Sequence, residues 1–198
     1  STPIKSSAAS DVYKRQPLDM MKDKPQECTK YYSDQVCDAI SKLSQRLDWN
    51  VIDKVLQAIH DSDSVAFFGT QFSHSAALHF QTDLLMLEKF TMAYMETERQ
   101  IDCARLMDEN SVAIIVTVNG FYARSNSKVL QYLKKSKCKV VLMTNNPGID
   151  IGINVNYTIV LGDSEQRKIG KHTLLTAVEL MSLRYYSLYY PGIQEKII

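Results

Sequence analysis

The sequence predicts a single α/β domain, in which a doubly wound parallel sheet of five strands has helices on both faces and follows two leading helices. Short apolar runs without polar alternation recur along the chain, as is typical of parallel strands buried on both faces. Segments with helical periodicity separate these runs, and such alternation predicts right-handed crossovers between parallel strands. The 198 residues are enough for one domain with a substantial core.

Two helices are predicted ahead of the first strand. The first begins at Ser33, and the second follows Asn50, the expected N-cap, with Asp53 completing a carboxylate form of the capping box. Each helix has an apolar stripe with helical spacing. The stripes consist of Val36, Ile40, Leu43 and Leu47 in the first helix and of Ile52, Val55, Leu56 and Ile59 in the second.

The chain ahead of these helices looks different in composition. Residues 1–32 contain three prolines and show no helical or strand period, so we expect a linker-like, extended or disordered segment. Its first part, up to about residue 16, resembles a tag or linker and is excluded from the fold. The domain is predicted to span residues 33–198.

Strands and helices alternate from residue 65 onward. The first strand is a wholly apolar run that ends abruptly at Gly69, where the chain can turn tightly. The predicted strands cover residues 65–68, 90–94, 112–118, 140–143 and 157–161. The predicted helices cover residues 75–87, 98–107, a segment around 129–133 and residues 173–189, the last ending before Pro191.

Composition narrows the class of protein. The net charge of +1 indicates neither a nucleic-acid-binding nor a membrane-binding surface. The four cysteines lack the spacing of a zinc site and are expected to be reduced thiols, so neither a metal site nor a cofactor is predicted. The sequence shows no apolar run long enough to cross a bilayer and no signal-peptide pattern, which predicts a soluble, cytoplasmic protein.

Three predicted strands end in similar polar loops. These loops are residues 69–73, 117–122 and 144–146, and they offer hydroxyls, amides and backbone N–H groups. In open α/β sheets, ligands bind outside the carboxyl ends of the strands. A helix that begins there directs the positive end of its dipole at an anion. Helix capping explains any one loop equally well, but the three together favour a crevice for a phosphate or polyol ligand.

Two of these loops resemble the signatures of the sugar isomerase (SIS) domain. That phosphosugar-binding module occurs in sugar-phosphate isomerases and in RpiR-type bacterial transcriptional regulators. Residues 69–73 with Ala77 are similar to Gly-x-Gly-x-Ser followed by alanine, and residues 117–122 are similar to Ser-x-Ser-Gly-x-Thr. The resemblance covers roughly residues 35–190. It implies a flavodoxin-like strand order, with the first and third strands adjacent and their two loops facing each other.

The resemblance also implies a set of ligand-binding residues. The chain departs from the family at three of them: Gln71 replaces a glycine, Asn119 replaces a serine, and Tyr122 replaces a small hydroxyl residue. We expect Tyr122 either to enter the pocket or to stack on a sugar. The implied ligand-binding residues are Gly69, Thr70, Gln71, Ser73, Thr117, Asn119, Gly120, Phe121, Tyr122 and Thr144.

The two leading helices are more similar to the regulators than to the enzymes. The resemblance therefore implies the effector-sensing SIS domain of an RpiR-type regulator, with a sugar phosphate or related anionic metabolite as its ligand. It also implies a homodimer or tetramer. Residues 1–32 are too short and too rich in proline for a helix-turn-helix region, so we expect this chain to bind no nucleic acid itself and to act through a DNA-binding region it lacks.

Two alternatives remain at this stage. One is a sugar-phosphate isomerase, for which His172 and Glu179 are the best acid–base candidates, because they are seven residues apart on one helix, with His74 as a third. Ordinary surface or helix-end roles explain all three equally. The other alternative is a degenerate SIS domain that only dimerises, its pocket closed by Gln71 and Tyr122. The tyrosines at 185–190 are expected either to pack on their own domain or to contact a second copy.

Overall fold

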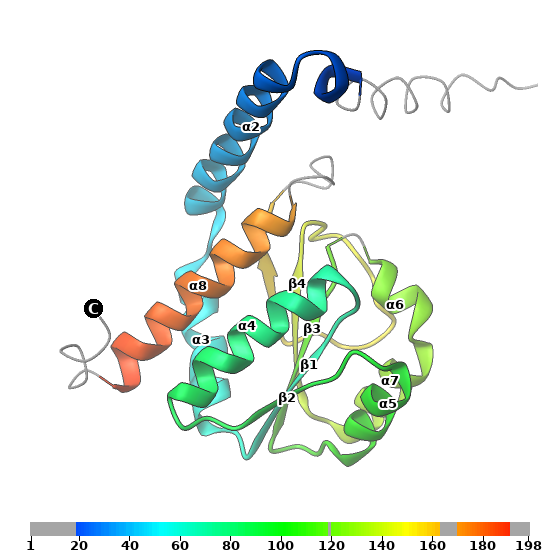
Figure 1. The fold of residues 1–198 in the computed structure, drawn as a ribbon. Helices are drawn as coiled ribbons and strands as arrows, with labels where there is room; N and C mark the ends of the chain where they lie inside the picture. The colour runs from blue at the N-terminus through cyan, green and yellow to red at the C-terminus, as the bar shows by residue number, and fades with distance from the viewer. Residues whose placement is uncertain (1–18, 119, 163–169, 191–198) are drawn as a thin grey trace, which may run out of the picture.

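The computed structural model describes residues 19–118, 120–162 and 170–190, and it shows a parallel sheet between two layers of helices (Figure 1). The strand order is β2-β1-β3-β4-β5, and every neighbouring pair is parallel. This confirms the predicted doubly wound α/β fold and its flavodoxin-like order. The strands are β1 (Ser64–Phe68), β2 (Thr91–Ala93), β3 (Ser111–Val116), β4 (Lys139–Thr144) and β5 (Tyr157–Val160).

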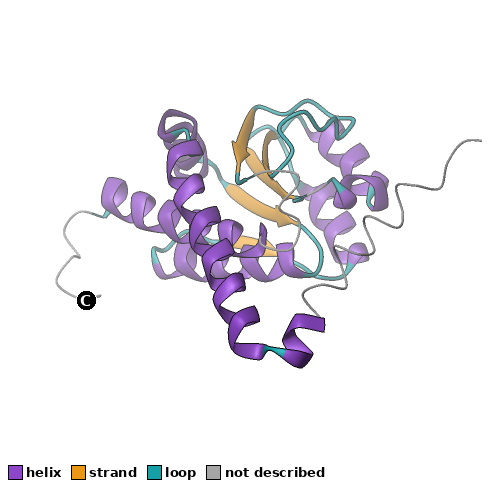
Figure 2. Ribbon diagram, turned by 90° about the horizontal axis from the view of Figure 1, so that it is seen from above, coloured by secondary structure: helices purple, strands orange, loops and turns teal. Residues whose placement is uncertain are grey.

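The helices lie on both faces of this sheet (Figure 2). One core contains side chains of α3, α4 and α8, and a second core on the opposite face contains side chains of α5, α6 and α7. Within the described ranges, no helix is long and apolar enough to cross a membrane. The helices are α2 (Pro25–Arg46), α3 (Trp49–Asp61), α4 (Phe72–Met86), α5 (Thr97–Leu106), α6 (Phe121–Ser125), α7 (Ser127–Ser136) and α8 (Gly170–Tyr189).

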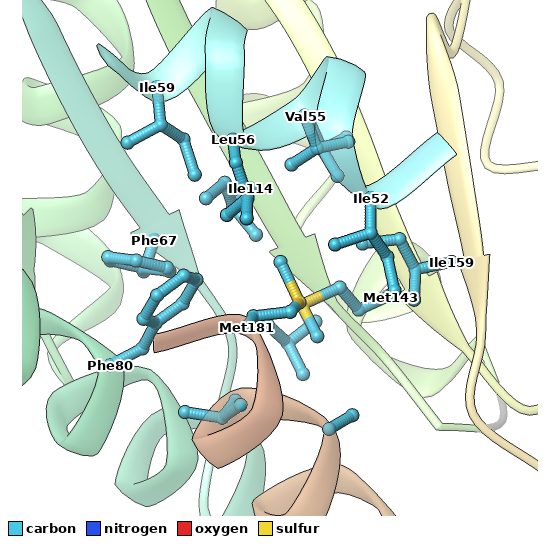
Figure 3. Close-up of a cluster of buried hydrophobic side chains, with 14 of the residues drawn as sticks. Ile52, Val55, Leu56, Ile59, Phe67, Phe80, Ile114, Met143, Ile159 and Met181 are labelled. Atoms are coloured by element: carbon cyan, nitrogen blue, oxygen red, sulfur yellow. The ribbon is translucent and has the colours of Figure 1, made fainter. Parts of the chain in front are cut away.

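The predicted stripe of α3 forms the centre of the first core. Its four apolar side chains are fully buried and point at the sheet, where they meet strand residues and Met181 of α8 (Figure 3). Burial of such a side chain contributes about 1.5–3 kcal/mol. The stripe therefore anchors α3 firmly beneath β1 and β3. It consists of Ile52, Val55, Leu56 and Ile59.

The helix α2 begins earlier than the sequence predicts. It starts at Pro25 instead of Ser33, so residues 25–32 are helical and not an extended linker. Proline at the first helical position suits a helix start, because its missing N–H would have no partner there. Only Cys28, Ala39 and Leu43 of this helix are buried, and much of α2 extends away from the sheet (Figure 1). With so few buried residues, its first turns show no apolar period.

Two local features also differ from the prediction. The N-cap of α3 is Asp48, whose carboxylate accepts hydrogen bonds from the N–H groups of Asn50 and Val51. Asn50 is therefore inside the helix rather than at its cap. The short helix α6 was not predicted, since five residues are too few to show a helical period.

The C-terminal tyrosines pack on their own domain. Tyr185 is buried, and Tyr189 stacks on His60 with ring centroids 3.8 Å apart. The hydroxyl of Tyr189 donates to Gln57, and that of Tyr190 donates to the carbonyl of Leu87. Of the two interpretations of this segment, intramolecular packing thus accounts for these three rings.

Candidate functional site

A cavity of about 190 Å³ lies at the carboxyl edge of the sheet, between the loops that follow β1 and β3. The two strands are neighbours, with Phe68 opposite Ile115, so their loops leave the sheet side by side. This confirms that the first and third strands are adjacent. We call it the carboxyl-edge cavity; it is lined by Thr70, Gln71, Phe72, Ser73, Val116, Thr117, Val118, Phe121 and Tyr122.

The first wall of this cavity is the start of α4. A Cβ atom added to Gly69 would lie 3.1 Å from Cβ of Ser73, so a glycine allows the helix to begin directly against the strand end. The N–H of Ser73 donates to the carbonyl of Thr70. Among the described residues, the N–H groups of Phe72 and His74 have no acceptor. Together with the positive end of the helix dipole, these groups suit an anion.

Gln71 keeps the backbone of a glycine at the entrance to α4. Its φ of 50° and ψ of −122° lie in a region that L residues rarely adopt. The resemblance places a glycine at this position, and the conformation explains why. A side chain held in such a conformation costs of order 1–3 kcal/mol, and strain of this kind is concentrated at ligand sites. The Gln71 side chain is exposed and caps no helix N–H.

The second wall follows β3. Thr117 is buried, and its hydroxyl oxygen accepts a hydrogen bond of 3.3 Å from the N–H of Tyr122. Gly120 has a φ of 74°, and a Cβ atom there would lie 1.8 Å from Cδ1 of Ile149. Phe121 is 65% exposed at the rim. Asn119, the other predicted ligand residue of this loop, lies outside the described residues.

Tyr122 forms part of the floor rather than a free stacking surface. It is only 2% exposed, and its hydroxyl donates to Oε1 of Gln100. Burial raises the pKa of its phenol well above the ordinary value of 10.0, so the hydroxyl stays neutral. Its ring contributes to the lining while its polar end is directed into the protein.

Gln100 is the residue of this region that sequence reasoning missed. It is buried on α5, where its Nε2 donates to the carbonyls of Gly69 (2.9 Å) and Tyr94 (2.7 Å). The sequence signal was weak but present. Gln100, Cys103 and Ala104 have the spacing of one helix face, and all three are buried. A glutamine on a buried face requires internal partners.

The third strand end does not line the cavity. Thr144 is fully buried; its hydroxyl donates to the carbonyl of Val118 and accepts from the N–H of Asn146. The neighbouring Asn145 is also buried, and its Oδ1 has no partner among the described residues. The structure thus brings two of the three predicted loops together and uses Thr144 to hold the second loop in place.

The predicted acid–base candidates point elsewhere. Nε2 of His172 lies 2.8 Å from the hydroxyl of Tyr32 on α2, and Oε2 of Glu179 lies 3.0 Å from Nε2 of His79 on α4. Neither candidate lines the carboxyl-edge cavity. His74 is buried in the first turn of α4 rather than solvated in a loop. Burial lowers its pKa, an effect that Glu96 partly offsets.

One group of side chains in the described part of the chain has the geometry to hold a metal ion. Ligand atoms of His79, Asp83 and Glu179 lie within 4.8 Å of one another on α4 and α8. The hydroxyl of Ser182 donates to Oδ2 of Asp83 at 2.6 Å and orients that carboxylate. An ion-pair network between two packed helices accounts for the same contacts.

Comparison with known proteins supports the assignment of the fold. The sugar isomerase domain of an RpiR transcription factor from Sphaerobacter thermophilus has a TM-score of 0.70 at 15% identity, covering 78% of this chain and 87% of that one. The Vibrio vulnificus NanR protein complexed with ManNAc-6P has a TM-score of 0.74 at 14% identity, covering 90% and 69%. Phosphoheptose isomerase GmhA from Neisseria gonorrhoeae has a TM-score of 0.70 at 14% identity, covering 83% and 100%. No protein-family model and no curated protein matches the chain. The chain therefore has the fold of the sugar isomerase (SIS) domain, which transcriptional regulators and phosphosugar isomerases share.

Proposed function

We propose that this chain is the phosphosugar-sensing domain of an RpiR-type transcriptional regulator. The observation that carries the proposal is the chemistry of the carboxyl-edge cavity. Its described lining is neutral, with the hydroxyls of Thr70 and Ser73 beside the start of α4. Donors around a helix N-terminus suit the phosphate of a sugar phosphate. Aromatic side chains at Phe72 and Phe121 would pack on the apolar face of the sugar.

The comparison with regulators favours this ligand class. The NanR protein that shares the fold was solved with ManNAc-6P, and another protein of the fold, from E. coli CFT073, was solved with a different sugar phosphate. In our proposal, Ser73, Thr117, Asn119 and Gly120 hold the anionic end of the ligand, whereas Gln71 and Tyr122 shape the remaining space. Thr70, Phe121 and Gly69 complete the site, and Thr144 supports it from behind.

The test is calorimetric titration of the chain with ManNAc-6P, arabinose phosphate and inorganic phosphate. We expect binding of at least one sugar phosphate, and weakening by about 1–2 kcal/mol in Ser73→Ala, as for a hydrogen bond to a charged group. Ser75→Ala is the matched control, because Ser75 is an exposed serine of the same helix outside the cavity. Binding that is equal in wild type and Ser73→Ala would remove Ser73 from the site. A chain that binds no sugar phosphate would instead be a dimerisation module.

Signalling to DNA would require a region beyond this fragment. In the proposal, α2 connects the domain to a DNA-binding region on its N-terminal side. The contact between Tyr32 of α2 and His172 of α8 would link α2 to the domain. A homodimer or tetramer would bring two such connections together. Sedimentation of the chain with and without ManNAc-6P would report both the oligomer and any change caused by the ligand.

A specific observation supports isomerase activity as the second candidate. The histidine and carboxylates of the His79–Asp83–Glu179 group provide acid–base chemistry outside the cavity. GmhA shows that the fold is also found in an isomerase. Turnover of a sugar phosphate in a coupled assay, lost in Glu179→Gln and kept in Glu98→Gln, would establish an enzyme. Glu98 is an exposed glutamate of α5 and serves as the control.

A further inference from the structure

Resting on the proposed function, we infer that Gln100 is a positioning residue that sets the separation of the two loops around the carboxyl-edge cavity. Its amide bonds to both loops at once. Nε2 holds the carbonyl of Gly69, at the end of β1, and Oε1 accepts the hydroxyl of Tyr122, at the start of α6. Its second strong Nε2 bond reaches the carbonyl of Tyr94, just beyond β2. One buried side chain thus joins three segments at the carboxyl edge.

The bonds continue from Gln100 into both walls of the cavity. On one side, Gly69 precedes Thr70, whose carbonyl accepts the N–H of Ser73 in the first turn of α4. On the other side, the backbone N–H of Tyr122 donates to the hydroxyl of Thr117. A movement of the Gln100 amide therefore displaces both walls together.

Burial makes this link rigid. Gln100 is 1% exposed, so no water is available to replace a lost partner. An unpaired buried carbonyl or hydroxyl is costly, and such a network keeps one arrangement. A cavity whose walls are held in advance loses less freedom when a ligand binds. The expected function of Gln100 is this preorganisation, and it makes no contact with the ligand itself.

The chain contains a matched control for this role. Gln81 of α4 also donates through Nε2 to a backbone carbonyl, that of Thr91, at 2.6 Å. This bond holds the start of β2, whereas Gln100 holds the segment beyond its end. Replacing either glutamine with methionine removes an amide of similar size. Only the Gln100→Met substitution should affect the cavity.

Hydrogen exchange tests the inference without a ligand. In Gln100→Met, the amides of residues 69–75 and 120–126 are expected to exchange about tenfold faster than in wild type, because local opening becomes easier. In Gln81→Met, those amides should keep the wild-type rates. Unchanged rates in Gln100→Met, or equal acceleration in both variants, would overturn the positioning role.

A second variant covers the case in which Gln100→Met fails to fold. Gln100→Glu retains the shape of the side chain but presents two acceptors to the carbonyls of Gly69 and Tyr94. A buried carboxyl has a raised pKa and donates once it is protonated. Protection of both loops in Gln100→Glu should therefore recover as the pH falls from about 8 to about 5. Protection independent of pH in this variant would contradict the inference.

Titration with ManNAc-6P and arabinose phosphate separates this inference from the proposed function. If wild type binds either probe, Gln100→Met should bind it about tenfold more weakly at a temperature where the variant is folded, and Gln81→Met should bind normally. If wild type binds neither probe, the proposed function fails, while the exchange data still decide the role of Gln100. Normal affinity in a folded Gln100→Met variant would show that Gln100 does not preorganise the site.

Discussion

The two edges of the sheet have cavities of nearly equal size and opposite chemistry. The carboxyl-edge cavity, about 190 Å³, has a neutral lining of hydroxyl, amide and aromatic groups. The amino-edge cavity, about 210 Å³, is lined by three carboxylates and one lysine. The charged groups of that second cavity are those of Asp61, Asp63, Glu109 and Lys139.

The direction of the helices explains this difference. In a parallel sheet, the helix after each strand begins at the carboxyl edge, so the positive end of α4 lies at the first cavity. The helix α3 ends at Asp61 beside the second cavity and adds its negative end to the carboxylates there. Size therefore does not distinguish the two cavities as anion sites. Topology and charge favour the carboxyl edge.

The largest expected effect comes from reversing the charge preference of the first cavity. Ser73→Asp should weaken sugar-phosphate binding by about 100-fold, or about 3 kcal/mol, because a carboxylate would face the phosphate. Thermal stability should not fall, since an acidic residue in the first turn favours the helix dipole. Calorimetry and thermal melting measure the two effects separately.

The control for this substitution lies at the other edge. Asn110→Asp adds the same charge to the amino-edge cavity, where Asn110 is exposed. Binding should remain within about twofold of wild type, because exposed charges beyond roughly 10 Å are screened at ordinary salt. Equal losses in both variants would mean that the anion is not bound at the carboxyl edge.

The next effect concerns the backbone of the second loop. Gly120→Ala should lower the free energy of unfolding by about 2 kcal/mol, since alanine is strained at a φ of 74° and its Cβ atom would collide with Ile149. Gly152 has a similar φ of 77°, but nothing lies within 4 Å of the added atom. Gly152→Ala should therefore cost only about 1 kcal/mol in urea denaturation. Equal costs would show that Ile149 moves aside freely.

A smaller effect should come from relieving strain at the two ends of α4. Gln71→Gly is expected to stabilise the fold by about 1 kcal/mol, because glycine adopts positive φ without strain. Glu88→Gly, with a φ of 59° just after α4, should give a similar gain. Only Gln71→Gly should change affinity for a sugar phosphate, since Gln71 lines the cavity. Matching changes in affinity would contradict a specific role for Gln71.

The smallest expected effect is a pH dependence from His74. Burial lowers its pKa below the ordinary value of 6.5, so the unfolded chain binds more protons than the folded one at mildly acid pH. Stability should therefore decline as the pH falls below about 6.5 and stop declining below the folded pKa. His74→Gln should flatten this part of the profile in thermal melts between pH 7 and pH 5. A variant with the wild-type slope would assign the dependence to other groups.

Local sequence patterns predicted the elements that positioned the cavity, with boundary errors where local signals competed. The runs around Val65 and Val112 were correctly predicted as strands, because burial on both faces leaves an uninterrupted apolar sequence. Glycine and hydroxyl residues after those strands correctly indicated the two loops that meet. The start of α2 and the Asp48 cap were missed, because polar helix turns and neighbouring cap residues give competing local signals.

The partners of polar side chains could not be predicted in the same way. His172 and Glu179 lie on one helix, yet one pairs with Tyr32 of α2 and the other with His79 of α4. Thr144 is turned inward although it follows a strand like the other two loops. Such pairings depend on which helix packs against which, and that is a property of contacts far apart in the chain.

The sequence by itself determined the alternation of buried strands and helices, and with it the edge of the sheet at which helix N-termini and small polar residues gather. Periodicity and glycine placement act over a few neighbouring residues, so they can be read locally. Only the tertiary structure decided that Gln100 joins the two loops, that Thr144 supports them and that the acid–base candidates face away. These roles arise from packing between distant segments, where burial selects the hydrogen-bonding partner of each polar group.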